Sequence, residues 1–244
     1  MIHSFSCKNF YSFGEFAEVN FEVNDNAPEN NGYFKTASGV RLSKVETVIG
    51  PNASGKTNLL KILPFLKWLI IDSFNAKPED PIVVQSFAFG EAKDKPTELA
   101  VVFELDGKIY TYEFILTKER ILIEKLDRST FVKEKKGTQQ IFSRKWNESK
   151  NIYEFDGENF KLPKDFESLL RKNASVIGTA ARLNHSESKE IAEFWQKIET
   201  NVVEAGWVGG HWGPDPRVRL MEALDFFSDN SDLKEQVEKV LSRY

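Results

Sequence analysis

Cysteine and long apolar runs are scarce in this chain of 244 residues. Its one cysteine, Cys7, cannot form an intramolecular disulfide, which fits a reducing compartment, and its alternating context predicts a small core residue. The most apolar stretch, residues 59–71, is too short to span a membrane and carries Lys61 and Lys67. The N-terminal residues lack the apolar run of a signal peptide. We therefore expect a cytoplasmic protein with no membrane partner.

A basic overall charge is also missing. The net charge is −4, so nucleic acid could bind only through a local patch. Hydrophobic residues make up 41% of the chain and 20 residues are phenylalanine, which argues against disorder throughout. A chain of this length buries a sizeable core without disulfides or metals, as one large domain or two small ones.

Patterns for metal binding and nucleophilic catalysis are absent as well. His185 and His211 stand apart from any cysteine or carboxylate cluster at ligand spacing, so we expect no zinc site. The sequence shows no recognisable Ser/His/Asp or Cys/His catalytic pattern. Trp207 and Trp212, near His211 in residues 204–216, indicate a loop anchored to the core or a partner contact; a functional loop is the alternative.

What the sequence does contain is a strand-rich first part. Asp106-Gly107 is a two-residue hairpin signal, and a further hairpin is expected around Lys136-Gly137. Residues 151–160 repeat the strand–Asp-Gly–strand pattern. Alternation and β-branched runs predict strands at residues 2–10, 15–23, 45–49, 97–105, 108–116 and 121–126, with 45–49 buried. A mainly antiparallel sheet follows from these patterns.

Helical patterns occur after residue 57 and in the last third. The stretch through Ile71 is apolar on nearly all sides, as in a buried helix, and Pro64 should kink it or end its first segment. Further helices are expected at residues 163–172, at 187–204, which has one apolar face, and from Asp232 onward, with Glu235 placed as in a capping box.

The stretch GPNASGKTNLLK fits the phosphate-loop pattern at Gly50, Gly55, Lys56 and Thr57. In such a loop, backbone N–H groups surround the β-phosphate, and the lysine reaches the β- and γ-phosphate oxygens. The threonine hydroxyl ligates Mg²⁺. The pattern follows a predicted strand and opens a predicted helix, which is its expected context. The alternative is a Gly/Ser-rich loop that contains lysine by chance.

A family resemblance extends beyond this motif. CKNFYSF at residues 7–13, ahead of the loop, is similar to the opening of the SMC/RecF-like ATPases of the ABC class. Their longer loop pattern is matched by Asn52, Ala53, Ser54, Asn58 and Leu59. Within that group the chain most resembles bacterial ATP-binding proteins of the OLD and abortive-infection type, which act in phage defence. Residues 95–126 resemble their antiparallel β-subdomain.

The resemblance implies an α/β P-loop NTPase fold: an ABC/SMC-like head, lobe I, with an antiparallel β-subdomain and a helical C-terminal segment. We expect residues 1–160 to form the ATP-binding lobe and residues 161–244 to form or lead to a second lobe. Lys56 and Thr57 would be catalytic, with Thr57 the metal ligand, and Ser12 and Phe13 would lie near the adenine by analogy. Contacts to ATP are assigned to Gly50, Pro51, Asn52, Ala53, Ser54, Gly55, Lys56, Thr57 and Asn58.

A complete head also needs a signature loop, an apolar strand ending in Asp-Glu and a switch histidine. Residues 69–72 come too soon after the loop, residues 101–106 end in a hairpin, and residues 208–210 lack the serine of a signature loop. Without the glutamate, the attacking water is not positioned. Either the chain is the N-terminal part of a longer protein, which we favour, or it is a degenerate head that signals without turnover.

The resulting hypothesis is an ATPase head in which ATP binding and hydrolysis control dimerisation and a DNA-directed or anti-phage effector. Its partners would be a second head, as a homodimer or higher oligomer, a nuclease or toxin effector, and DNA. The alternative is a non-hydrolysing scaffold that holds such a partner. A small-molecule kinase would need an acceptor pocket with a carboxylate or lid arginines, and no such spacing is present.

Two weaker features complete the sequence reading. Residues 128–150 hold seven basic residues against two acidic ones, with Phe131, Phe142 and Trp146 interleaved. This run indicates either contact with a phosphate backbone or, as we favour, a solvated hairpin with an apolar underside. Gln85 could be the Mg²⁺-sensing glutamine that the resemblance implies, although glutamine stands at strand edges for many reasons.

Overall fold

The computed structural model describes residues 1–24, 26–28, 32–132, 135–200, 202, 221, 224–226 and 228–241. The chain divides into two units, Met1–Val202 and Val203–Tyr244. Within the second unit, helix α6 spans Ser231–Leu241, which agrees with the helix predicted from residue 232. The domain boundary that we place after residue 160 stays a prediction. In the described part of the chain, no helix combines the length and the apolar character needed to cross a membrane.

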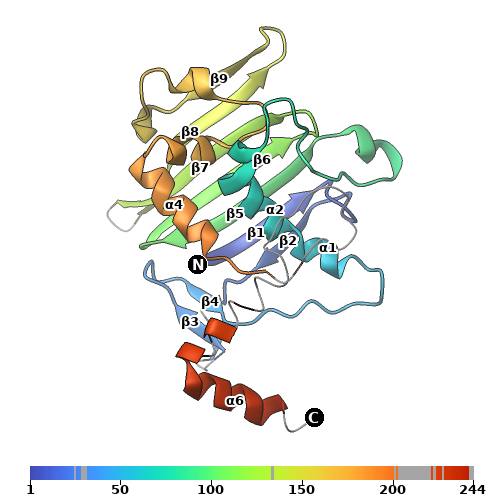
Figure 1. The fold of residues 1–244 in the computed structure, drawn as a ribbon, viewed down its shortest axis with the longest axis vertical. Helices are drawn as coiled ribbons and strands as arrows, with labels where there is room; N and C mark the ends of the chain where they lie inside the picture. Colours follow the sequence, from blue (N-terminus) through green and yellow to red (C-terminus); the bar gives the residue numbers. More distant parts are fainter. Residues whose placement is uncertain are drawn as a thin grey trace. The chain divides into compact units, whose positions relative to one another are not determined.

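A seven-stranded antiparallel sheet forms the centre of the first unit (Figure 1). Its strand order is β2-β1-β5-β6-β7-β8-β9, and a separate hairpin pairs β3 with β4. The mainly antiparallel sheet that the sequence predicts is therefore confirmed. The strands span Ile2–Lys8 (β1), Ala17–Asn20 (β2), Tyr33–Lys35 (β3), Arg41–Ser43 (β4), Thr97–Leu105 (β5), Lys108–Leu116 (β6), Ile121–Val132 (β7), Lys135–Asn147 (β8) and Ile152–Asp156 (β9).

The two predicted hairpins differ in outcome. Asp106 and Gly107 both have positive φ, 50° and 75°, as a two-residue turn between β5 and β6 requires, so that prediction is confirmed. The second hairpin, predicted from Thr130 to Trp146, is present as the antiparallel β7–β8 pair, but its predicted turn position at Lys136-Gly137 is wrong, because Gly137 pairs with Thr130 inside the ladder.

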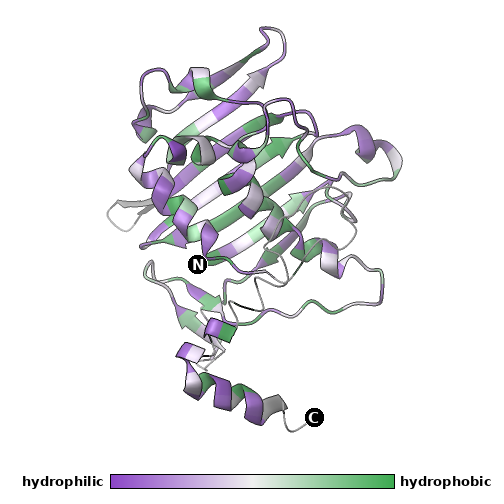
Figure 2. Cartoon of the chain, in the orientation of Figure 1, coloured by the Kyte–Doolittle hydropathy of each residue, from purple (hydrophilic) through white to green (hydrophobic). Residues whose placement is uncertain are grey.

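Helices cover one face of this sheet (Figure 1). They are α1 (Lys56–Leu60), α2 (Ile62–Lys67), a π-helical turn (Trp68–Asp72), α3 (Val176–Arg182) and α4 (Ser186–Gln196). Short 3₁₀ turns lie at Ser73–Asn75, Gly90–Asp94, Glu158–Phe160 and Phe166–Leu169. Along β5–β8, hydrophobic residues alternate with polar ones (Figure 2). The helix after the loop begins as predicted, and its first segment ends at Leu60, four residues before Pro64, whose missing N–H leaves the Leu60 carbonyl without its helical donor.

The core lies between this helical layer and the sheet. Phe103 on β5 stacks with Phe194 at a centroid distance of 5.1 Å and meets Trp195 edge-on at 5.9 Å. Phe10 contacts Phe65 of α2 at 5.8 Å. Cys7 is buried, so its predicted role as a small core residue is confirmed.

Several predicted elements in the last third are shorter or different. Residues 158–160 form a 3₁₀ turn and not a strand, since Phe160 is buried against the Phe142 and His185 rings. The helix expected at 163–172 is a 3₁₀ turn, and the one expected at 187–204 ends at Gln196. Helix α3 was not predicted, because β-branched residues and Gly178 give it a weak helical pattern, and burial stabilises it instead.

A buried ion pair joins the sheet to α3. Glu124 on β7 and Arg144 on β8 are both fully buried, 2.5 Å apart. Glu124 accepts hydrogen bonds from the Tyr112 hydroxyl and, at 2.8 Å, from the Val176 N–H that begins α3. Burial first, and then the charge of Glu124, raises the pKa of Tyr112 well above its ordinary value. Arg144 also donates to the Ala174 carbonyl at 2.5 Å. The Arg144 guanidinium, the Tyr112 hydroxyl and the Val176 N–H thus converge on the Glu124 carboxylate inside the core.

Replacing Arg144 with methionine should destabilise the fold strongly. The Glu124 carboxylate would stay buried without its cation, so we expect the free energy of unfolding to fall by about 3–5 kcal/mol. The double variant Glu124→Leu/Arg144→Met should recover much of this loss, because no charge is left buried. Urea unfolding of both variants measures the two values. A double variant as unstable as Arg144→Met would show that the unpaired charge of Glu124 is not the cause of the loss.

A second polar cluster attaches the β3–β4 hairpin to the sheet. His3 lies between Glu22 and Glu104, with each ring nitrogen 3.1 Å from a carboxylate oxygen. Glu104 also accepts hydrogen bonds from the Ser38 N–H at 2.8 Å and the Ser38 hydroxyl at 2.6 Å, in the turn between β3 and β4. Burial alone would raise the pKa of Glu104, but the hydrogen bonds from Ser38, Thr36 and His3 lower it overall.

This lowered pKa predicts an acid-sensitive contribution to stability. The contribution is present above the unfolded-state pKa of a glutamate, about 4.3, and is lost as pH falls through the lower folded-state pKa. Glu104→Gln should therefore lose less stability than the wild type between pH 5 and about pH 3. Urea titrations across this pH range measure the free energy of unfolding of both proteins. If it falls equally with pH in the wild type and in Glu104→Gln, Glu104 does not cause the acid sensitivity.

Candidate functional site

Residues 50–55 form a tight, solvent-exposed loop ahead of α1. Ala53 and Gly55 have left-handed backbones, with φ of 64° and 93°, and the Ser54 N–H donates to the Pro51 carbonyl at 3.3 Å. Gly55 is the residue immediately before α1. Turns of this kind direct successive backbone N–H groups toward a common concavity, the arrangement that binds anions.

Both pattern glycines have close neighbours, and Gly55 is the more constrained of the two. A Cβ on Gly50 would lie 2.8 Å from the Ser54 hydroxyl oxygen. A Cβ on Gly55 would lie 3.1 Å from Cβ of Ser12, and the left-handed φ adds strain for any other residue. The spacing of the two glycines thus follows from close contacts at both ends of the loop.

Lys56 lies across the loop. Its ammonium donates to the Gly50 carbonyl at 2.9 Å and to the Pro51 carbonyl at 2.7 Å. These acceptors are neutral, so an anion placed beside the loop would offer stronger, charge-assisted hydrogen bonds in exchange. The Lys56 ammonium can therefore turn toward an anion without breaking an ion pair in the described structure.

The other predicted residues occupy different places. Asn52, Ser54 and Thr57 are exposed, with Thr57 in the first turn of α1. The Asn58 side-chain amide donates to the Ser12 hydroxyl instead of facing the loop. Geometry thus brings Lys56, Gly50 and Pro51 together and turns Asn58 toward the end of β1. The assignment of all nine residues to ATP remains a prediction.

The buried strand expected before the loop is wrong. Residues 45–49 have no strand pairing, and Val45 and Ile49 are 75% and 89% exposed. Among the described residues, no backbone hydrogen bond joins positions 46–49 to a neighbouring segment. A β-branched run indicates a strand only where another strand lies alongside it, and here the described chain provides none.

The turn after β1 forms a wall beside the loop. Ser12 and Phe13 are the side chains nearest to Gly55. The Tyr11 N–H donates to the Gln85 carbonyl at 2.8 Å, while the Gln85 side chain is exposed. The sequence placed Ser12 and Phe13 near the nucleotide by analogy, and the structure brings them to the loop. A magnesium-sensing role for Gln85 remains a prediction.

No carboxylate pair of the Asp-Glu kind lies beside the loop in the described chain. Asp72 ends the π-helical turn, where burial raises its pKa against the opposing effect of Lys67 and Arg182. Asp106 sits in the β5–β6 hairpin. Residues 204–216, with Trp207, His211 and Trp212, lie outside the described residues. Across the described ranges, no group of three or more His, Cys, Asp or Glu side chains could hold a metal ion.

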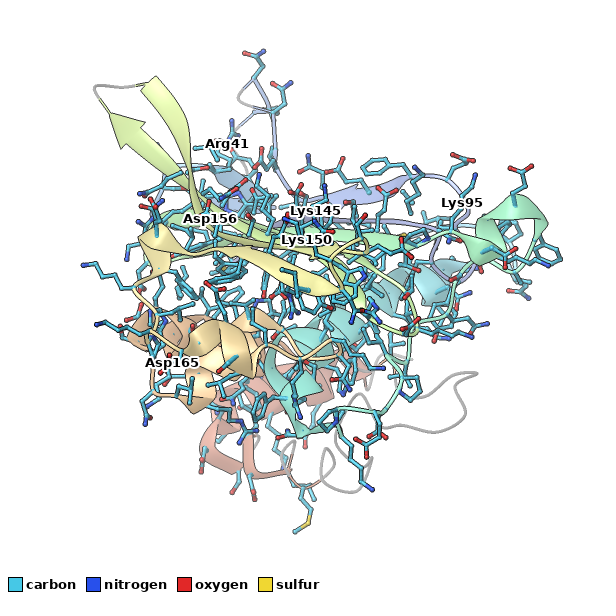
Figure 3. The ribbon with its side chains drawn as sticks, turned by 90° about the horizontal axis from the view of Figure 1, so that it is seen from above. Arg41, Lys95, Lys145, Lys150, Asp156 and Asp165 are labelled. Carbon is cyan, nitrogen blue, oxygen red and sulfur yellow. The ribbon has the colours of Figure 1, made fainter. Side chains whose placement is uncertain are left out.

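Three basic residues of the run at 128–150 form ion pairs in the structure. Arg144 is buried, Arg128 pairs with Glu187 at 3.1 Å, and Lys150 pairs with Glu154 at 3.1 Å. Phe142 belongs to the core, as the favoured hairpin interpretation predicts. Lys145, Lys150 and Asp156 lie at the level of the sheet, away from the helices (Figure 3). The side chains of Lys133, Lys135 and Lys136 lie outside the described part.

His185 has a structural role. Its Nδ1 atom caps the N-terminus of α4 by accepting the Ser188 N–H at 3.3 Å. The same nitrogen lies 2.9 Å from the Ser188 hydroxyl. Capping satisfies a backbone donor that the helix itself leaves unpaired. A histidine used in this way explains its isolation from other candidate ligands in the sequence.

Comparison with known proteins gives one family. A family model described as "AAA domain, putative AbiEii toxin, Type IV TA system" matches residues 47–184, more than half of the chain. The matched part begins just before the loop and ends after α3. Domains of this family are of the P-loop ATPase type, which agrees with an α/β fold. Comparison with curated proteins gives no significant match.

Gly55→Ala should lower the free energy of unfolding by about 1–2 kcal/mol, because alanine is strained in the left-handed region. Contact with Ser12 adds to that cost. Gly90→Ala is the matched control, since Gly90 also has positive φ but has no atom within 4 Å of the added Cβ. Urea unfolding should therefore show a larger loss at Gly55. Equal losses would mean that the Ser12 contact imposes no constraint.

Proposed function

We propose that this chain, which belongs to the AAA-domain family of the AbiEii toxin and type IV toxin–antitoxin class, binds ATP with Mg²⁺ at residues 50–57. The single observation that carries the proposal is the loop geometry. Left-handed residues at 53 and 55, close-packed glycines and the Lys56 ammonium meet at one exposed turn. This is the donor set that a polyphosphate requires.

The residues fit a triphosphate in the following way. Lys56 would donate to the β- and γ-phosphate oxygens in place of the Gly50 and Pro51 carbonyls, and loop N–H groups would hold the β-phosphate. Thr57, exposed at the start of α1, supplies the hydroxyl for the metal. When bound, Mg²⁺ neutralises charge on the β- and γ-phosphate oxygens. Asn58 supports the site from its far side through Ser12.

The finer assignment is an SMC/RecF-like head that acts as a dimer. Hydrolysis needs a group that orients the attacking water, and no carboxylate pair of the described chain lies beside the loop. A second head or a further segment would supply the missing groups. Residues 1–160 would then form the ATP-binding lobe, with residues 161–244 as part of the connection to a second lobe.

A second candidate is a binding module without turnover. The lack of a water-orienting carboxylate near the described loop favours it, since Lys56 and Mg²⁺ alone stabilise charge without positioning water. In this form ATP would stabilise the state that holds a toxin, nuclease or antitoxin partner. The family description, which refers to a toxin–antitoxin system, supports a defence role for either candidate.

Lys56→Ala should weaken Mg²⁺-ATP binding roughly ten- to hundredfold, because hydrogen bonds to charged groups contribute about 1.5–3 kcal/mol each. Isothermal calorimetry measures the affinity directly. Lys150→Ala is the matched control, since it also removes one exposed lysine but lies beside β9, at the far edge of the sheet. Equal affinities for wild type and Lys56→Ala would overturn the proposed site.

Turnover separates the two candidates. Phosphate release by the wild type in Mg²⁺-ATP, above the level of Lys56→Ala, would support the ATPase. Binding by calorimetry together with phosphate release no faster than that of Lys56→Ala would support the non-hydrolysing module.

A further inference from the structure

A buried lysine stands one turn behind the phosphate loop. Lys61 lies between α1 and α2 and is only 5% exposed. Its ammonium lies 4.2 Å from the centroid of the Tyr11 ring, a cation–π contact. The Lys61 N–H donates to the Thr57 carbonyl at 3.1 Å, so the helix is continuous with the loop at this point. In the sequence, Lys61 stands out only as a charge in an apolar stretch.

The contact is one of two between the same pair of segments. Asn58, three residues before Lys61 and on the same side of the helix, donates to the Ser12 hydroxyl. Tyr11 and Ser12 are consecutive residues of the turn after β1. Two neighbouring helix residues therefore meet two neighbouring turn residues. We call this four-residue set the clamp: Tyr11, Ser12, Asn58 and Lys61.

We infer that Asn58 and Lys61 are positioning residues for the proposed nucleotide site, which act by holding the β1 turn against Gly55. The inference rests on the proposed function. Ser12 is the side chain that a Cβ on Gly55 would meet at 3.1 Å, so the place of Ser12 limits the path of the loop. The clamp in turn fixes Ser12. It thereby sets the backbone from which the phosphate-binding N–H groups project.

Preorganisation is the physical basis of the expected effect. Residues 50–54 are all exposed, so the fixed point of the loop is its packed end at Gly55. A loop released at that end must be ordered when the anion binds, and that ordering weakens the affinity. The effect should appear in binding and leave global stability nearly unchanged for Ser12 and Asn58, because Ser12 is exposed and Asn58 only partly buried.

The Tyr11 ring, and not its hydroxyl, is the part that the clamp uses. Tyr11 is 8% exposed, and its hydroxyl oxygen is buried without a hydrogen-bond partner in the described structure. Burial lowers the pKa of Lys61, whereas the Tyr11 ring face beside the ammonium favours the charged form. Tyr11→Phe keeps the ring and is the matched control for Tyr11→Leu.

The test measures dissociation constants for Mg²⁺-ATP by calorimetry, with urea unfolding of every variant. We expect Ser12→Ala and Asn58→Ala each to weaken Mg²⁺-ATP binding about two- to tenfold. The double variant should bind Mg²⁺-ATP as tightly as either single variant. Ser12→Thr, which keeps the hydroxyl, should bind Mg²⁺-ATP with the affinity of the wild type. Lys61→Met and Tyr11→Leu should weaken binding roughly three- to thirtyfold, while Tyr11→Phe stays near wild type.

Two outcomes would overturn the inference. One is an unchanged affinity in the clamp variants with a lower free energy of unfolding, which would make the contacts purely structural. The other is additive losses for Ser12→Ala and Asn58→Ala, which would mean that they do not act through each other. Lys56→Ala separates the two proposals: if it abolishes binding while the clamp variants bind normally, the nucleotide site stands and the clamp fails. If the wild type does not bind Mg²⁺-ATP, both fail.

Discussion

The buried carboxylate of Glu124 is the constraint on which the first unit depends. It meets the Arg144 guanidinium, the Tyr112 hydroxyl and the first N–H of α3, so three adjacent strands and a helix share one charge. Arg144 then extends the network to the carbonyls of Arg171 and Ala174. Such a network tolerates few rearrangements, because any movement leaves a polar group buried without its partner.

Residues 171–175, which lead into α3, also hold the helical turns that follow α2. Ser175 donates its hydroxyl to the Ile70 carbonyl at 2.8 Å, and Asn173 donates to the carbonyls of Lys77 and Asp80 at 2.6 and 3.0 Å. Arg171 donates to the Phe74 carbonyl. The helix is therefore tied to the sheet network behind and to the β1 turn in front.

Local signals in the sequence predicted the parts of this structure that local chemistry decides. Asp106-Gly107 specified a turn, Pro64 ended a helical segment, and the glycines at 50 and 55 specified a tight loop. Each follows from backbone sterics within a few residues. The candidate loop was therefore legible before any tertiary contact was known.

Features that depend on contacts between distant residues could not be predicted from the sequence. Helix α3 is stabilised by burial and not by propensity, and the run at 45–49 has strand composition without a strand beside it. The Lys61–Tyr11 pair joins residues fifty positions apart, and no periodic pattern reports such a contact. The fully buried Arg144 looked like part of a basic surface run because sequence alone does not show its partner.

The exposed run at 45–49 has a consequence for handling the chain. Val45 and Ile49 lie in solvent, and Lys44 offsets the charge of Glu46, so residues 44–49 form a short segment of high strand propensity and no net charge. This composition favours pairing between molecules. Concentrated solutions should accordingly self-associate through this run, and dilute, low-temperature storage would keep the neighbouring loop accessible.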